Sequence, residues 1–212
     1  MKRLVPLDGI APTLSFIDLH DEWRPMSNEG LRAYRTECIE ALHAIDLEVV
    51  EAVVSVLLVA RDSGRMVFIT GNGGSAATAS HMATDLMFGS QLIDPALRVI
   101  ALTDNQAIIT ATGNDLEFDQ IFTRQLTKLA QPGDVLIAIS ASGNSPNILS
   151  CVVAAKAMNL TTIGFTGFDG GTLATLVDLS IHVPTRVGAY GPTEDVHLAV
   201  NHMITEQLKC AK

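Results

Sequence analysis

Five short apolar runs, separated by stretches that can form helices, constrain the fold of this chain more than any other feature. The runs are continuously hydrophobic instead of alternating, which is typical of strands that are covered on both faces in a parallel sheet. We therefore predict an α/β fold, with a five-stranded parallel doubly wound sheet flanked by helices. The strands are expected at residues 66–70, 99–103, 135–140, 162–166 and 179–183.

Helical periodicity surrounds this sheet. Between Asn28 and Arg61, apolar residues recur at spacings of three and four, which predicts a long N-terminal helix with at most one break. A last helix is expected from about Thr193 to Leu208. Residues 1–27 contain three prolines and have mixed polarity, so we interpret them as an N-terminal arm. The rest of the chain, residues 28–212, is long enough for one domain and too short for two.

Composition limits the classes of function. The net charge is −9 without a basic cluster, which argues against binding to nucleic acid. No run of eighteen apolar residues could cross a membrane, and the N-terminal segment lacks the apolar region of a secretory signal. The three cysteines are far apart and show no CxxC spacing, so a disulfide framework or a cysteine zinc site is not expected. We expect a cytoplasmic protein.

Glycine and serine gather in two of the turns that follow the predicted strands. The first strand ends in Gly-Asn-Gly-Gly-Ser-Ala-Ala at residues 71–77, and the third ends in Ser-Ala-Ser-Gly-Asn-Ser-Pro at residues 140–146. Glycine lets the backbone approach a ligand, a helix start directs free N–H groups at an anion, and serine adds hydroxyl donors. Ligands of parallel sheets bind beyond the carboxyl ends of the strands. The two turns together therefore predict a phosphate site.

Other interpretations of these turns remain. Glycine turns and serine caps are common at strand-to-helix junctions that bind nothing. Gly71, Gly73 and Ala76 fit the loose G-x-G-x-x-A form of a dinucleotide site, for which Asp104 would be the acidic partner. Asp104 lies further along the chain than the position about 20 residues after the glycines where the motif expects its acid. A dinucleotide would also not require the second serine turn. No P-loop motif occurs, so we expect no nucleotide cofactor.

The motifs in combination resemble those of the sedoheptulose 7-phosphate isomerases, which are proteins of the SIS (sugar isomerase) type. The resemblance runs over about residues 30–210 and rests on residues 71–75, His81, 103–104, 113–115, 139–147, 166–171 and 196–197. It implies a flavodoxin-like SIS fold, and a homotetramer with sites between subunits. It also implies substrate contacts from Asn72, Gly73, Ser75, Asp104, Ser140, Ser142, Ser145 and Glu194.

A second group of residues can carry acid/base chemistry. His81 and Asp85 are four residues apart on one helix face, and Glu194 and His202 lie two turns apart on the last helix. Isomerisation through an enediol needs a base and an acid, and the same four side chains could instead bind a zinc-like metal. In the family that the chain resembles, the position of Asp85 holds a glutamate base, that of Glu194 a glutamine, and that of His202 a histidine acid. We expect Asp85 as base and His202 as acid; the alternative use of the four residues is to hold one divalent metal, such as zinc.

Departures from the family pattern leave the exact function open. Aspartate at residue 85 is one methylene shorter than the family's glutamate. The segment of residues 185–193 is longer than the corresponding segment of these isomerases and differs from it in composition. The first hypothesis is an isomerase that converts sedoheptulose 7-phosphate to the heptose 7-phosphate. An eight-carbon sugar phosphate is the alternative substrate. A non-catalytic SIS adaptor that binds a replication initiator protein is the alternative class, against which the retained Asp85 and His202 argue.

Overall fold

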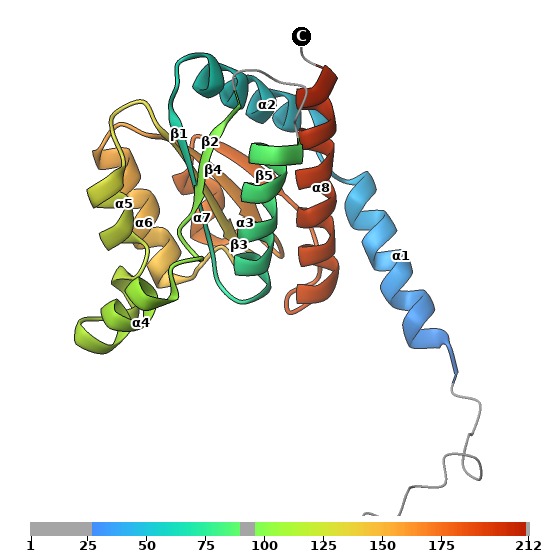
Figure 1. Ribbon diagram of the computed structural model, residues 1–212. Helices are drawn as coiled ribbons and strands as arrows, with labels where there is room; N and C mark the ends of the chain where they lie inside the picture. Colours follow the sequence, from blue (N-terminus) through green and yellow to red (C-terminus); the bar gives the residue numbers. More distant parts are fainter. Residues whose placement is uncertain (1–26, 90–95, 211–212) are drawn as a thin grey trace, which may run out of the picture.

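All strands of the described chain form one parallel sheet. The computed structural model describes residues 27–89 and 96–210 (Figure 1), so the predicted arm lies almost wholly outside the described residues. The strand order is β2-β1-β3-β4-β5, and each neighbouring pair is parallel. This is the flavodoxin-like doubly wound order, which confirms the predicted fold class. The strands are β1 (Met66–Gly71), β2 (Arg98–Ala101), β3 (Val135–Ser140), β4 (Thr161–Thr166) and β5 (Leu179–His182).

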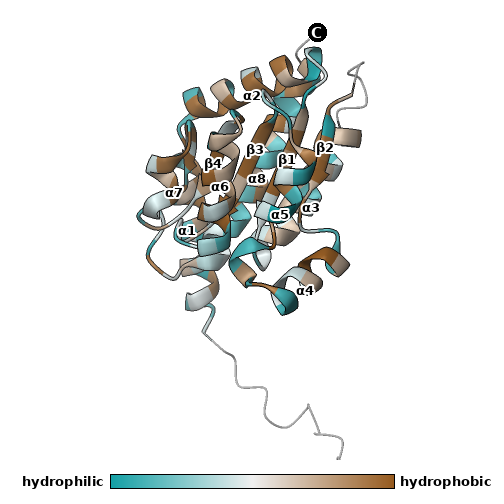
Figure 2. Ribbon diagram, turned by 90° about the vertical axis from the view of Figure 1, so that its left-hand side faces the viewer, coloured by the Kyte–Doolittle hydropathy of each residue, from teal (hydrophilic) through white to brown (hydrophobic). Residues whose placement is uncertain are grey.

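Side chains of the sheet are buried on both faces, as the continuous apolar runs predicted. In β1, Val67 and Ile69 belong to one hydrophobic cluster, whereas Phe68 between them belongs to the other. This alternation follows from the two-residue period of a strand. Figure 2 shows the hydrophobic residues concentrated on the strands and on the helix surfaces around them. Two separate cores, one on each face, therefore fix the register of the sheet.

The helices divide between these two faces. The first cluster contains buried side chains of α2 (Leu47–Asp62), α3 (Gly74–Thr84) and α8 (Tyr190–Cys210). The second contains side chains of α6 (Pro146–Ala157) and of two shorter helices, α5 (Thr123–Leu129) and α7 (Gly171–Leu176). α1 (Glu29–His43) lies against α8 outside these layers, and α4 (Gln106–Asp115) follows β2 (Figure 1). None of the described helices is long and apolar enough to span a membrane.

The predicted N-terminal helix is broken once, as the sequence allowed. It separates into α1 and α2 at Ala44–Asp46, and the Asp46 carboxylate caps α2 by accepting a hydrogen bond from the Glu48 N–H at 2.9 Å. The last helix begins at Tyr190, three residues before the predicted start. Pro192 lies in the first turn of this helix, where proline is tolerated because its missing N–H would have no partner.

Candidate active site

The two turns singled out in the sequence lie side by side at one edge of the sheet. They follow β1 and β3, which are neighbours in the sheet although about 70 residues apart in the chain. The chain continues from β1 outward to β2, and from β3 in the opposite direction to β4. The gap between the two turns is therefore the topological switch point, where ligands bind in doubly wound sheets.

The first turn brings the start of α3 to this switch point. Gly73 precedes the helix with a φ of +55°, a left-handed conformation that a residue with a side chain rarely adopts. Any Cβ atom at Gly71 would overlap the main chain of Ser75. The turn is consequently tight, and it places Ser75, which is buried, in the first turn of α3, beside the free N–H groups of that helix.

The second turn gathers serine hydroxyls at the start of α6. Pro146 is the first residue of this helix, as predicted, and Ser145 occupies the capping position without a capping hydrogen bond from its side chain. Instead, the Ser145 Oγ lies 3.2 Å from the Ser140 Oγ. Gly143 has a φ of +63° and packs so closely on Gly170 that a Cβ atom would overlap its carbonyl. The Ser140 and Ser145 hydroxyls therefore lie together in a tight turn instead of capping the helix.

A pair of amides ties the two turns together across the switch point. The Asn72 Nδ2 donates to the Asn147 Oδ1 at 2.8 Å, and the Asn147 Nδ2 donates back to the Asn72 Oδ1 at 2.9 Å. Asn147 is buried, and its Oδ1 also accepts the Ile148 N–H at 3.0 Å. The separation of the two turns is therefore fixed before any ligand binds, which reduces the entropy lost on binding.

A small pocket with several polar side chains in its wall opens between the turns. Its volume is about 110 Å³, which equals three to four water molecules at about 30 Å³ each. This space suits a phosphate group. Tyr190 contributes to the wall but was not predicted, because the last helix was expected to begin after it. The lining residues are Asn72, Ser75, Ile139, Ser140, Ala141, Ser142, Ser145, Tyr190 and Glu194.

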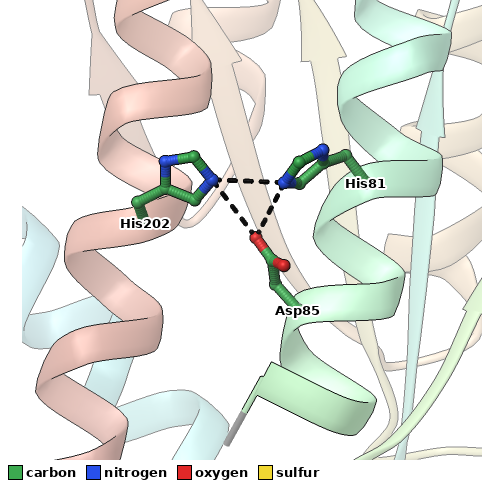
Figure 3. A group of neighbouring side chains, drawn as sticks. All are labelled: His81, Asp85 and His202. Carbon is green, nitrogen blue, oxygen red and sulfur yellow. Dashed lines mark hydrogen bonds and ion pairs between the residues drawn. The ribbon is translucent and has the colours of Figure 1, made fainter.

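Further along the same two helices, α3 and α8, three of the four predicted acid/base residues converge (Figure 3). The His81 Nε2 lies 3.2 Å from the Asp85 Oδ2, and the His202 Nε2 lies 3.5 Å from the same oxygen. The two imidazole nitrogens are 3.1 Å apart. His81 and Asp85 come from adjacent turns of the helix that begins at the pocket, and His202 comes from α8, which packs beside it. From Asp85, the backbone continues as one π-helical turn, Asp85–Gly89, a feature that often marks functional sites.

The donor atoms of this cluster fit a divalent metal. They are two imidazole nitrogens and one carboxylate oxygen, a set that zinc accepts at sites with an open position. Around a tetrahedral Zn²⁺ with bonds of about 2.0–2.1 Å, neighbouring ligand atoms lie about 3.3–3.4 Å apart. The three distances of 3.1, 3.2 and 3.5 Å agree with that spacing.

Two further predicted residues lie elsewhere. Glu194 lines the pocket instead of joining the three-residue cluster, and its carboxylate lies so close to Gly74 that a Cβ atom there would overlap it. Burial, and secondarily the charge of Asp195, raise the pKa of Glu194. Asp104 is exposed and accepts hydrogen bonds from the hydroxyls of Ser80 and Thr103.

His197 has a structural environment away from the cluster. It is fully buried, its Nε2 lies 3.1 Å from the Thr166 carbonyl oxygen, and its Nδ1 has no hydrogen-bond partner. The Nε2 therefore carries the proton of the neutral ring, and a second proton would place a buried charge on Nδ1. Burial accordingly lowers the pKa of His197 to about 4.

This burial predicts a pH-dependent loss of stability. The unfolded chain takes up a proton at His197 near pH 6.5, whereas the folded chain does so only near pH 4. The free energy of unfolding should fall by up to about 3 kcal/mol as the pH drops through this window, and be unaffected above it. Denaturant unfolding at pH 7.5 and pH 4.5 should show a smaller loss in His197→Gln. An equal loss in both proteins would show that His197 is not responsible.

Comparison with known proteins places the chain in a family. Residues 32–167 match the family model described as "SIS domain". The phosphoheptose isomerase of Chlorobaculum parvum is 37% identical over 175 residues, which cover 82% of this chain and 83% of that protein. The chain belongs to the phosphoheptose isomerase family. Another member, from Nitratidesulfovibrio vulgaris, is 41% identical over 143 residues, 68% of each chain.

Solved structures of phosphoheptose isomerases have the same fold. The phosphoheptose isomerase of Neisseria gonorrhoeae superposes with a TM-score of 0.78 at 30% sequence identity, over 87% of this chain and 100% of the other. The enzyme of Francisella tularensis gives a TM-score of 0.76 at 29% identity, over 87% of this chain and 96% of the other. These likenesses confirm the SIS fold that was expected from the sequence.

Proposed function

We propose that this protein is an aldose–ketose isomerase that converts sedoheptulose 7-phosphate to the heptose 7-phosphate through an enediol. The observation that carries the proposal is that one helix, α3, contributes residues both to the phosphate-sized pocket and to the three-residue cluster. Ser75 lines the phosphate-sized pocket, and His81 of the three-residue cluster follows six residues later. Six residues of helix rise about 9 Å, a distance that a phosphorylated sugar of several carbons can bridge.

The proposed reaction assigns one task to each part of the site. The hydroxyls of Ser75, Ser140, Ser142 and Ser145, with the N–H groups at the helix starts, hold the phosphate and so fix the position of the sugar. Asp85 takes the proton from the carbon beside the carbonyl, and His202 gives a proton to the carbonyl oxygen. The resulting enediol then receives the proton back on the former carbonyl carbon, while the neighbouring hydroxyl loses its proton.

A divalent metal, such as zinc, could take over the role of His202 at the carbonyl, because an imidazole nitrogen that binds a metal has no proton to donate. His81, Asp85 and His202 would hold it, and Glu194 could complete the set only if its side chain turned from the pocket toward them. When bound, the ion would supply a Lewis acid that polarises the carbonyl group. The agreement of the donor spacing with zinc coordination supports the assignment. If the enzyme keeps full turnover after a chelator has removed all metal, the proton transfers proposed for Asp85 and His202 do not require the ion.

We further propose that the enzyme is a cytoplasmic homotetramer with sites completed between subunits. Cys38, Cys151 and Cys210 are all free, which is typical of a reducing compartment such as the cytoplasm.

The exposure of the cluster supports sites completed between subunits. The His81 and His202 side chains are 47% and 54% exposed, so the cluster of the single chain is open on one side. Exposed apolar residues of α1, such as Leu31 and Ile39, offer contacts to another subunit. Light scattering should give about 90 kDa, four times 22.6 kDa.

A substrate series tests the proposed activity and its specificity. Sedoheptulose 7-phosphate, an eight-carbon ketose phosphate and unphosphorylated sedoheptulose are compared by their kcat/KM. We expect the seven-carbon phosphate to be the best substrate, and the sugar without phosphate to be poor because it leaves the serine hydroxyls unpaired. A higher kcat/KM for the eight-carbon phosphate would move the assignment to that alternative. Absence of turnover with every sugar phosphate would favour the non-catalytic adaptor, which the names of the relatives do not support.

The position of Glu194 predicts an unusual effect of removing its charge. Its carboxylate lies at the positive end of α3, where it competes with the phosphate and repels it. Glu194→Gln should lower the KM for the sugar phosphate by about two- to tenfold, and less at high salt, because a single charge acts weakly at a solvent-accessible site. Steady-state kinetics at two salt concentrations provide the measurement. If Glu194 instead binds the metal, the variant will lose metal affinity and its KM will not fall.

A further inference from the structure

A buried asparagine contacts the proposed base from inside the protein. Asn201 lies on α8 immediately before His202, and its side chain is completely inaccessible to solvent. Its Nδ2 donates a hydrogen bond to the Asp85 Oδ2 at 2.7 Å. This is the same oxygen that lies 3.2 Å from His81 and 3.5 Å from His202. The oxygen therefore has two half-exposed imidazoles and one buried amide around it.

Packing and stability do not explain this residue. The neighbouring buried positions of α8 include the apolar residues Val200, Ile204 and Leu208, all at 0% exposure. Asparagine is a poor helix former and is seldom fully buried. The Asn201 Oδ1 is also buried without a hydrogen-bond partner, which costs about 1–3 kcal/mol. A stability cost at a position beside the site is typical of a residue retained for function.

The chemistry of the amide suits a carboxylate that must stay available. An amide N–H is a neutral donor, so it fixes the orientation of the carboxylate without neutralising its charge, as lysine or arginine would. Asp85 is one methylene shorter than the glutamate that the family resemblance places there. Its carboxylate therefore depends more on a fixed orientation to reach the histidines and the substrate.

We infer that Asn201 is a positioning residue for Asp85, which holds the short carboxylate against His81 and His202 and thereby adapts the site to aspartate. The inference rests on the proposed function of Asp85. Asn201 does not contact the phosphate pocket, so its effect belongs to the reacting end of the sugar and to the metal. The phosphate end should be unaffected.

Asn201→Leu removes the donor, and it also removes the unpaired Oδ1, so the variant should unfold at the same temperature as the parent or higher. Its Kd for Zn²⁺, measured by competition with a chelating dye, should rise by about 10- to 100-fold, and kcat should fall by a similar factor. The KM for sedoheptulose 7-phosphate and the Kd for inorganic phosphate should change by less than about twofold. Thr205→Val is the matched control, because Thr205 is buried one turn away and its hydroxyl donates a hydrogen bond to the Asn201 main-chain carbonyl oxygen.

A second background separates positioning from a general role in folding. In Asp85→Glu, the longer carboxylate reaches the histidines without help, so adding Asn201→Leu should change kcat and the Zn²⁺ affinity by less than about threefold. A loss of the same size in both backgrounds would mean that Asn201 does not act through Asp85. Parent-like kcat and Zn²⁺ affinity in Asn201→Leu alone would overturn the inference while leaving the proposed function intact. If the unmodified protein neither turns over sugar phosphates nor binds Zn²⁺, the proposed function and the inference both fail.

Discussion

Asp85→Asn is expected to lower kcat for sedoheptulose 7-phosphate by about 10²- to 10⁴-fold, the usual contribution of a positioned general base. The amide has nearly the shape of the carboxylate but cannot take a proton. The phosphate pocket lies at the other end of the site, so the Kd for inorganic phosphate should be unchanged. Steady-state kinetics and calorimetric phosphate binding are the measurements.

The control for this variant is Asp62→Asn. Asp62 is the last residue of α2, has an exposed side chain and pairs with Arg61, away from the pocket and the cluster. We expect it to leave kcat unchanged, because single surface ion pairs contribute little. Asp85→Asn with kcat close to that of the parent would show that another group is the base.

Ser145→Ala is expected to raise the KM for sedoheptulose 7-phosphate by about 10- to 100-fold. A hydrogen bond to a charged group is worth about 1.5–3 kcal/mol, and alanine leaves one phosphate oxygen without its donor. Because the Ser145 side chain does not cap α6, the substitution should cost little stability. The KM and the inhibition constant of inorganic phosphate should rise together while kcat stays within a fewfold of the parent value.

Ser150→Ala provides the matched control on the same helix. Ser150 is partly buried on α6, and its Oγ lies 3.2 Å from the Thr123 Oγ1, outside the pocket. It should bind substrate like the parent. A KM for Ser145→Ala no higher than that of Ser150→Ala would remove Ser145 from the phosphate site.

The fold could be predicted because its signals are local. The central strands β1 and β3 are largely apolar runs, and Pro146 marked the start of α6 at the residue where the structure has it. The start of α8 was missed by three residues because the first turn of a helix makes few hydrogen bonds within itself. The meeting of the two turns followed from the expected sheet order, since the carboxyl ends of neighbouring parallel strands lie at one edge.

The site could be predicted only in part, because several of its contacts depend on packing between helices. The spacing of Glu194 and His202 predicted that they lie on one side of the last helix, but eight residues rise about 12 Å. Glu194 consequently reaches the pocket, and His202 reaches His81 and Asp85. Asn201 gave no signal in the sequence, because its contact with Asp85 exists only where α8 packs on α3.

The central claim is that Asp85 moves a proton at the carbon beside the carbonyl of a sugar held by its phosphate. The most direct test incubates the protein with sedoheptulose 7-phosphate in deuterated water and follows hydrogen exchange at the carbons beside the carbonyl by NMR. We predict exchange with the unmodified protein and none above background with Asp85→Asn. Absence of exchange with the unmodified protein, with and without added Zn²⁺, would contradict the claim.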